Sequence, residues 1–155
     1  MDQQGYNKSA IFWISVLALF TAAVANAVRA GASVAMKAEL FDPHDPAHSG
    51  ELIGATLGNS FLGFALSLLL ISPLLDKFGA KRVLLFAALC FILGPVLTLI
   101  AAGTNDYGSM HTLLNLGMVI WGFAWGATEG SINPLTTTIY PDDKQMILKD
   151  RAVDL

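Results

Sequence analysis

Four long apolar segments constrain this chain more than any other feature. They cover residues 11–30, 52–75, 83–102 and 113–139, and each is close to the ~20 residues that an α-helix needs to cross a bilayer. A backbone in lipid must satisfy its own hydrogen bonds, so all four segments are predicted to be helices. The composition is 54% hydrophobic and 14% charged, whereas soluble domains contain about 25% charged residues. The sequence therefore predicts an all-α membrane protein with four transmembrane helices.

The positions of the basic residues predict the orientation of the chain. Two of them, Arg29 and Lys37, lie on one side of the predicted membrane. Because cytoplasmic loops carry the excess of Lys and Arg, both termini are expected in the cytoplasm and the protein in the plasma (inner) membrane. The net charge of -3 gives no basic surface for nucleic acid. The other side of the membrane has Lys8, Lys77, Lys81, Arg82, Lys144, Lys149 and Arg151.

The last apolar segment contains a polar stripe. Trp121, Trp125, Glu129 and Asn133 recur every four residues, and four residues advance a helix by only about 40° beyond a full turn. An acid inside the membrane is costly, and such acids usually face an aqueous cavity or a partner. The stripe is therefore a candidate solute and proton site. The alternative is that the tryptophans only fill space and that a neighbouring helix caps Glu129.

The depth of Glu129 favours a role in proton binding. It lies ten residues before residue 139, which is about 15 Å along a helix and half of a hydrocarbon core of ~30 Å. Desolvation at the midplane disfavours a charged carboxylate, so Glu129 is expected to take up and release protons. Pro134, directly after Asn133, is expected to bend the helix beside a cavity, although a simple kink is equally allowed.

Three polar side chains in the first two segments are further candidates. Asn26 and Arg29 share one face of the first helix, and Arg29 lies about 12 Å from the level of Glu129. Arg29 is expected to snorkel to the outer headgroups or to guard the outer mouth. Asn59 in the second segment is either a hydrogen-bonded contact between helices or part of a cavity wall.

Glycines at four-residue spacing predict where helices pack closely. In membranes, small residues let helix backbones approach each other. The fourth segment has Gly122, Gly126 and Gly130, and the second has Gly54 and Gly58. Both stripes are predicted to be helix contacts.

Several kinds of chemistry are not indicated. His44 and His48 lie in a connection with Pro43 and Pro46, which prevent the helix that would bring both histidines to one side of a metal ion. No Ser and His pair at membrane depth points to a hydrolase. We expect no metal, no cofactor and no enzymatic activity.

The connection SPLLDKFGAKR at residues 72–82 resembles the loop between the second and third helices of the major facilitator superfamily. The family pattern is G-x-L-a-D-r-x-G-r-k-r, and this chain matches it at Asp76, Gly79, Lys81 and Arg82, with Ser72 in place of the first glycine. The resemblance implies secondary transport by alternating access. It also implies that the acid and the bases of this loop form a latch that steadies one conformation.

The stretch EGSINP, residues 129–134, is similar to E-T-x-x-N-P in the fucose, galactose and glucose proton symporters of that superfamily. The resemblance implies that Glu129 lines a sugar cavity and that the solute enters with protons. One departure is that Asn26 is followed by Ala27, where the fucose transporter has an acid.

The superfamily builds two six-helix bundles, so a chain with four helices resembles an incomplete N-terminal bundle. Residues 1–144 are expected to form it, and residues 145–155 to be a polar cytoplasmic tail that differs from the family. Transport would then need the missing helices. The alternatives are a small dimerising proton-coupled efflux protein and a membrane assembly subunit without transport activity, for which the glycine stripes would be the essential feature.

Overall fold

The computed structural model describes residues 7–139, except the side chains of Ser72 and of residues 137–139. Within this range there is no strand, so the prediction of an all-α fold is confirmed. The predicted tail at residues 145–155 and the basic residues Lys144, Lys149 and Arg151 lie outside the described residues. The elements are α1 (Lys8–Met36), the π-helix η1 (Lys37–Phe41), α2 (Ser49–Phe78), α3 (Ala80–Ala102) and α4 (Tyr107–Ile139).

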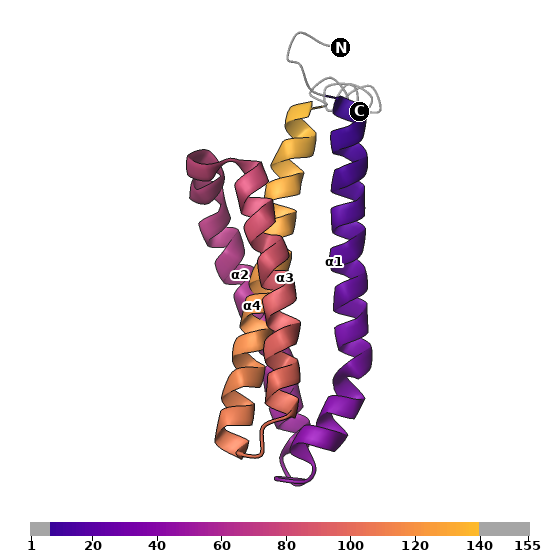
Figure 1. Ribbon diagram of the computed structural model, residues 1–155, viewed down its shortest axis with the longest axis vertical. Helices are drawn as coiled ribbons and strands as arrows, with labels where there is room; N and C mark the ends of the chain where they lie inside the picture. The colour runs from indigo at the N-terminus through magenta and orange to yellow at the C-terminus, as the bar shows by residue number, and fades with distance from the viewer. Residues whose placement is uncertain (1–6, 140–155) are drawn as a thin grey trace, which may run out of the picture.

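The four long helices run antiparallel to their neighbours in sequence, and α1 stands to one side of the other three (Figure 1). One end of the bundle, called the Gly79 end, holds the start of α1, the turn between α2 and α3, and the end of α4. The other end, called the Phe41 end, holds η1 and the connection from α3 to α4. Helix α4 packs extensively on both α2 and α3, whereas α1 contacts the bundle sparsely.

Three of the described helical segments are long and apolar enough to cross a membrane by length and composition: Lys8–Phe41, Ser49–Ile71 and Ala80–Ala102. The predicted fourth span, in α4, is not among them. Its sequence is interrupted by glycines, hydroxyl side chains and Glu129. These residues lie in the helix that packs against both α2 and α3.

The first helix is longer than predicted. Residues 31–51 lie between the first two predicted segments, but α1 continues to Met36 and passes into η1 up to Phe41. Only residues 42–48 remain outside a helix. η1 ends just before Pro43, which has no backbone N–H to continue the helical hydrogen bonds, although Asp42 itself still has helical angles.

The Phe41 end contains an apolar cluster that ties α1 to the bundle. Phe41 is fully buried and presents its ring edge to His111 of α4 at a centroid distance of 6.3 Å. Phe41 is the last residue of the π-helix η1, in which both Leu40 and Phe41 are buried. The other buried members are Leu40, Ile53, Ala101, Met110, Leu114 and Met118.

Two carboxylates outside the membrane-spanning segments stabilise turns at this end. Lys37 donates to Asp42 Oδ1 at 2.7 Å, and hydrogen bonds from Lys37 and Ser49 lower the pKa of Asp42. Asp106 Oδ2 accepts from the backbone N–H of Ser109 at 2.7 Å at the start of α4, and hydrogen bonds from Ser109 lower the pKa of Asp106. A lowered carboxyl pKa contributes stability that is lost as the pH falls through the folded-state value.

At the Gly79 end, a single residue separates α2 from α3. Gly79 has φ 77, and it is the only residue in the described part of the chain with a positive φ. Its N–H donates to the carbonyl of Leu75 at 2.8 Å and closes α2. Only glycine adopts this backbone conformation without strain, which explains the glycine at this position of the loop.

Close backbone approach holds α4 to α2. A Cβ atom at Gly122 would overlap the backbone of Ser60, and one at Gly126 would lie 2.7 Å from the carbonyl oxygen of Phe64. A Cβ at Gly63 would in turn overlap the carbonyl of Val119. The two helices therefore touch through glycines from both sides.

The predicted packing role of Gly54 and Gly58 is wrong, because a Cβ at either position would meet nothing within 4 Å. Gly94 in α3 makes a close contact with α4 that was not predicted. A Cβ there would lie 3.0 Å from the carbonyl oxygen of Gly117 in α4. Gly130 faces the side chain of Ile71 in α2 rather than a backbone.

Candidate functional site

Two residues of the polar stripe of α4, Trp125 and Glu129, are hydrogen-bonded to each other where Trp125 meets α2, whereas Trp121 also borders α1 and α3. Trp125 Nε1 donates to Glu129 Oε1 at 2.6 Å, and the carboxyl group is half-buried. The ring of Trp125 packs against Phe64 of α2 at 4.6 Å and Phe61 at 6.2 Å between centroids. The indole is thereby held in place to orient the acid. The donor to Glu129 comes from its own helix, one turn earlier, rather than from a neighbouring helix.

Arg29 lies nearer the Phe41 end. Its guanidinium donates from Nη1 to the hydroxyl of Ser60 and from Nη2 to Asn26 Oδ1 at 2.7 Å. The residue is 6% exposed, and its Nε has no hydrogen-bond partner. The expectation that Arg29 snorkels to the outer headgroups is therefore wrong. The physical reason is that α1 continues for two more turns beyond Arg29, which keeps the side chain inside the bundle.

Aromatic rings connect the two charged residues. The Arg29 Cζ atom lies 5.9 Å from the ring centroid of Phe61 and 6.0 Å from that of Trp121, both within the range of cation–π attraction. Trp121 is eight residues before Glu129, or about 12 Å along α4. We call Phe61, Phe64, Trp121 and Trp125 the aromatic strip. It has a cation at one end and an acid at the other.

The remaining predicted site residues are not all part of this arrangement. Asn59 Nδ2 donates to Asn115 Oδ1 at 2.6 Å, which joins α2 to α4, and Asn115 Nδ2 donates to the carbonyl of His111. Asn59 is thus a contact between helices. Asn133 is exposed, one turn beyond Glu129, and α4 continues through Pro134 to Ile139.

A groove lies between α1, α3 and α4. It consists of two adjoining cavities of about 330 and 600 Å³, which share Thr21, Ala88 and Phe91 in their walls. Trp121 contributes to the larger cavity and Thr128 to the smaller. The walls are otherwise almost entirely apolar, so this groove does not suit a polar solute. The polar face toward α2 is the better candidate.

The loop residues Asp76, Lys81 and Arg82 are all exposed at the Gly79 end. No hydrogen bond or ion pair joins Asp76 to either base among residues 7–139. Arg82 stands at the rim of an apolar cavity of about 390 Å³ between α2, α3 and α4. The structure thus places the loop at one end of the bundle, with its charged side chains exposed.

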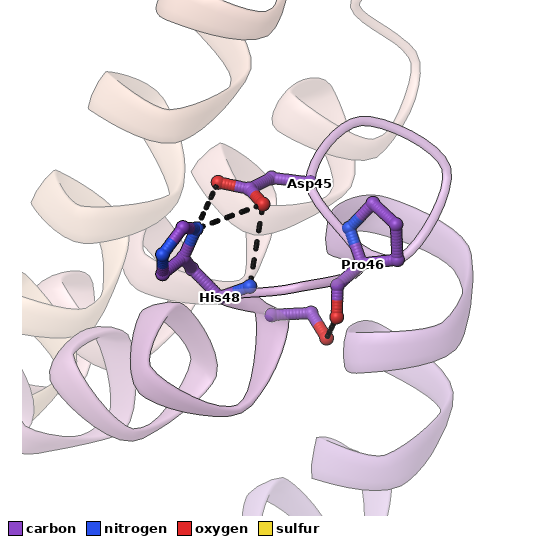
Figure 2. Close-up of polar contacts among 4 residues, drawn as sticks. Asp45, Pro46 and His48 are labelled. Carbon is purple, nitrogen blue, oxygen red and sulfur yellow. Dashed lines mark hydrogen bonds and ion pairs between the residues drawn. The ribbon is translucent and has the colours of Figure 1, made fainter.

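The two histidines of the connection at residues 42–48 have separate partners. Figure 2 shows His48, whose Nδ1 lies 3.0 Å from both carboxylate oxygens of Asp45 and whose backbone N–H donates to the same group. His44 Nδ1 instead contacts the carbonyl of Leu40, and its ring stacks on Tyr107. Within the described residues, no group of three or more His, Cys, Asp or Glu side chains could hold a metal ion.

Sequence reasoning missed Ser60, Phe61, Phe64 and Asn115. Asn115 carried a usable signal, since an amide inside an apolar span is as unusual there as Asn59. Ser60, Phe61 and Phe64 carried none, because a serine and two phenylalanines are ordinary in a membrane helix. Only the crossing of α2 with α4 assigns them to the site.

A comparison with protein families matches residues 3–137 to a family described as sugar (and other) transporter. No curated protein and no solved structure matches the chain.

Proposed function

Because the chain belongs to the family of sugar (and other) transporters, we propose that it is part of a transporter that carries a sugar-like solute together with protons, with Glu129 as the proton-binding group. The predicted membership of the major facilitator superfamily is confirmed at the level of this family. The fucose, galactose and glucose symporter branch, proton coupling and alternating access remain predictions. The partners that we propose are a small-molecule solute, protons and the lipid bilayer.

The observation that carries the proposal is the hydrogen bond from Trp125 to Glu129. The acid is half-buried in a membrane helix, and its recorded partner in the described chain is a neutral indole rather than a cation. Acids at membrane depth are costly and usually face an aqueous cavity or a partner, and the absence of a cation beside this one supports a role in binding a proton. The flanking aromatic rings offer flat apolar surfaces against which the faces of a sugar ring can pack.

We expect Glu129→Gln to abolish proton-driven accumulation. A gradient of one pH unit is worth about 1.4 kcal/mol per proton, so one coupled proton supports about tenfold accumulation of the solute. The amide keeps the shape and the contact with Trp125 but cannot release a proton. The measurement is uptake of a labelled hexose into proteoliposomes with an acidic exterior, with Glu51→Gln, an exposed acid at the start of α2, as the matched control.

Proton coupling is disproved if Glu129→Gln accumulates solute to the same level as the unaltered chain. If neither protein transports and both remain folded, the result favours the alternative of a membrane assembly subunit. The close helix contacts through Gly122 and Gly126 would then serve assembly rather than transport.

We also propose that the Gly79 end faces the cytoplasm of the plasma membrane. Lys77, Lys81 and Arg82 lie there, which supports this orientation through the charge bias of membrane proteins. In a background with Cys90→Ser, Lys77→Cys should react with a membrane-impermeant maleimide only after right-side-out vesicles are opened. Ala47→Cys, at the Phe41 end, should react before opening. The reverse pattern would overturn the orientation.

A further inference from the structure

Arg29 is a buried cation without a buried anion. In the part of the chain that the structure describes, no ion pair joins it to a carboxylate, and its partners Ser60 and Asn26 are neutral. Its Nε is buried and has no hydrogen-bond partner. A guanidinium stays charged at every physiological pH, so this group cannot escape the cost of burial by losing a proton.

Glu129 does not supply the missing charge. It lies about 12 Å along α4 from Trp121, the ring that the Arg29 guanidinium overlies, and its carboxylate already accepts from Trp125. The rings of Phe61 and Trp121 reduce the free-energy cost of burying the Arg29 guanidinium, but they carry no net charge. The guanidinium therefore retains the capacity for one anion, which a planar carboxylate would satisfy through paired N–H donors.

Resting on the proposed function, we infer that the transported solute carries a carboxylate, as sugar acids do, and that Arg29 binds this group. The ring of the solute then lies along the aromatic strip, because Phe61 and Trp121 flank the guanidinium. Its far end points toward Trp125 and Glu129. The carboxylate of the solute thus balances the positive charge of Arg29, which no carboxylate of the described chain pairs with.

Counting charges favours a carboxylate over a phosphate. Arg29 contributes one positive charge, which a carboxylate balances, whereas a phosphate ester carries about 1.5 to 2 negative charges at pH 7 and leaves an excess. With a proton on Glu129 the loaded site is neutral. One anion and one proton then cross together without moving net charge, whereas a neutral sugar with a proton moves one positive charge.

The test uses the complete transporter that contains this chain, in proteoliposomes with a pH gradient and three solutes: glucuronate, glucose and glucose 6-phosphate. We expect glucuronate uptake to exceed that of glucose and of the phosphate ester at least tenfold. A potassium diffusion potential imposed with valinomycin should leave glucuronate uptake unchanged. Arg29→Gln should lower it at least tenfold, Arg29→Lys should retain part of it, and Lys37→Gln, a surface cation paired with Asp42, should leave it unaltered.

The inference is overturned if glucose is taken up under the pH gradient and glucuronate neither enters nor competes, an outcome that leaves the proposed function intact. It is equally overturned if glucose 6-phosphate is preferred, or if Arg29→Gln carries glucuronate at the original rate. If the pH gradient drives none of the three solutes, the proposed function itself fails. The solute preference and the response to potential are measured on the unaltered chain, so they stand even if Arg29→Gln does not fold.

Discussion

Valine in place of Gly122 should prevent α2 and α4 from packing, and little folded protein should be recovered. The Cβ of any larger residue would overlap the backbone of Ser60, which cannot move aside as a flexible side chain could. The helices would have to separate along their whole contact, which also involves Gly63 and Gly126. Overpacking typically costs 1 to 3 kcal/mol, and we expect about 3 kcal/mol or more because backbone is involved.

The measurement is the thermal unfolding midpoint in detergent together with the fraction of monodisperse protein on size exclusion. Gly58→Val is the matched control, because it makes the same change in helix propensity at a position in α2 where nothing lies within 4 Å. Equal midpoints for the two variants would show that the contact at Gly122 does not hold the bundle together.

A second large effect is expected from Phe41→Ala. Phe41 is fully buried between α1, α2 and α4, and the loss of a buried phenylalanine typically costs about 3–5 kcal/mol. Phe20→Ala is the control, since the Phe20 side chain of α1 is 65% exposed and its loss leaves no buried cavity. Chemical unfolding in micelles compares the two. A loss of stability no greater for Phe41→Ala than for Phe20→Ala would refute the role of this cluster as the anchor of α1.

The helices and the α4 stripe could be predicted because both follow from one-dimensional patterns. Long apolar runs determine helices in a membrane, and four-residue spacing places Trp121, Trp125 and Glu129 on one face. The turn at Gly79 could also be predicted, since only glycine adopts a positive φ without strain.

The environment of Arg29 could not be predicted, because it depends on contacts between residues far apart in sequence. In a sequence, a charged residue near the end of an apolar segment indicates the membrane surface. Residues 31–41 nevertheless extend the helix beyond Arg29, and no residue before Pro43 marks its end. Ser60, which accepts from Arg29, lies 31 residues later. The glycines illustrate the same limit, since their spacing does not tell which neighbour they face: Gly54 and Gly58 face open space, and Gly63 makes the contact.

The small extent of contact between α1 and the other helices has a mechanical consequence. Its buried residues are Ser15, Ala22 and Arg29, one every seven positions, and the first two have small side chains with little contact to lose. Beyond Arg29 the helix is fastened through Phe41. From Arg29 to Lys8 it is a rigid arm of about 31 Å, so a tilt of about 10° about Arg29 would swing its free end by about 5 Å, one helical pitch. A ligand held at the pivot of such an arm would be sensed at the opposite membrane surface.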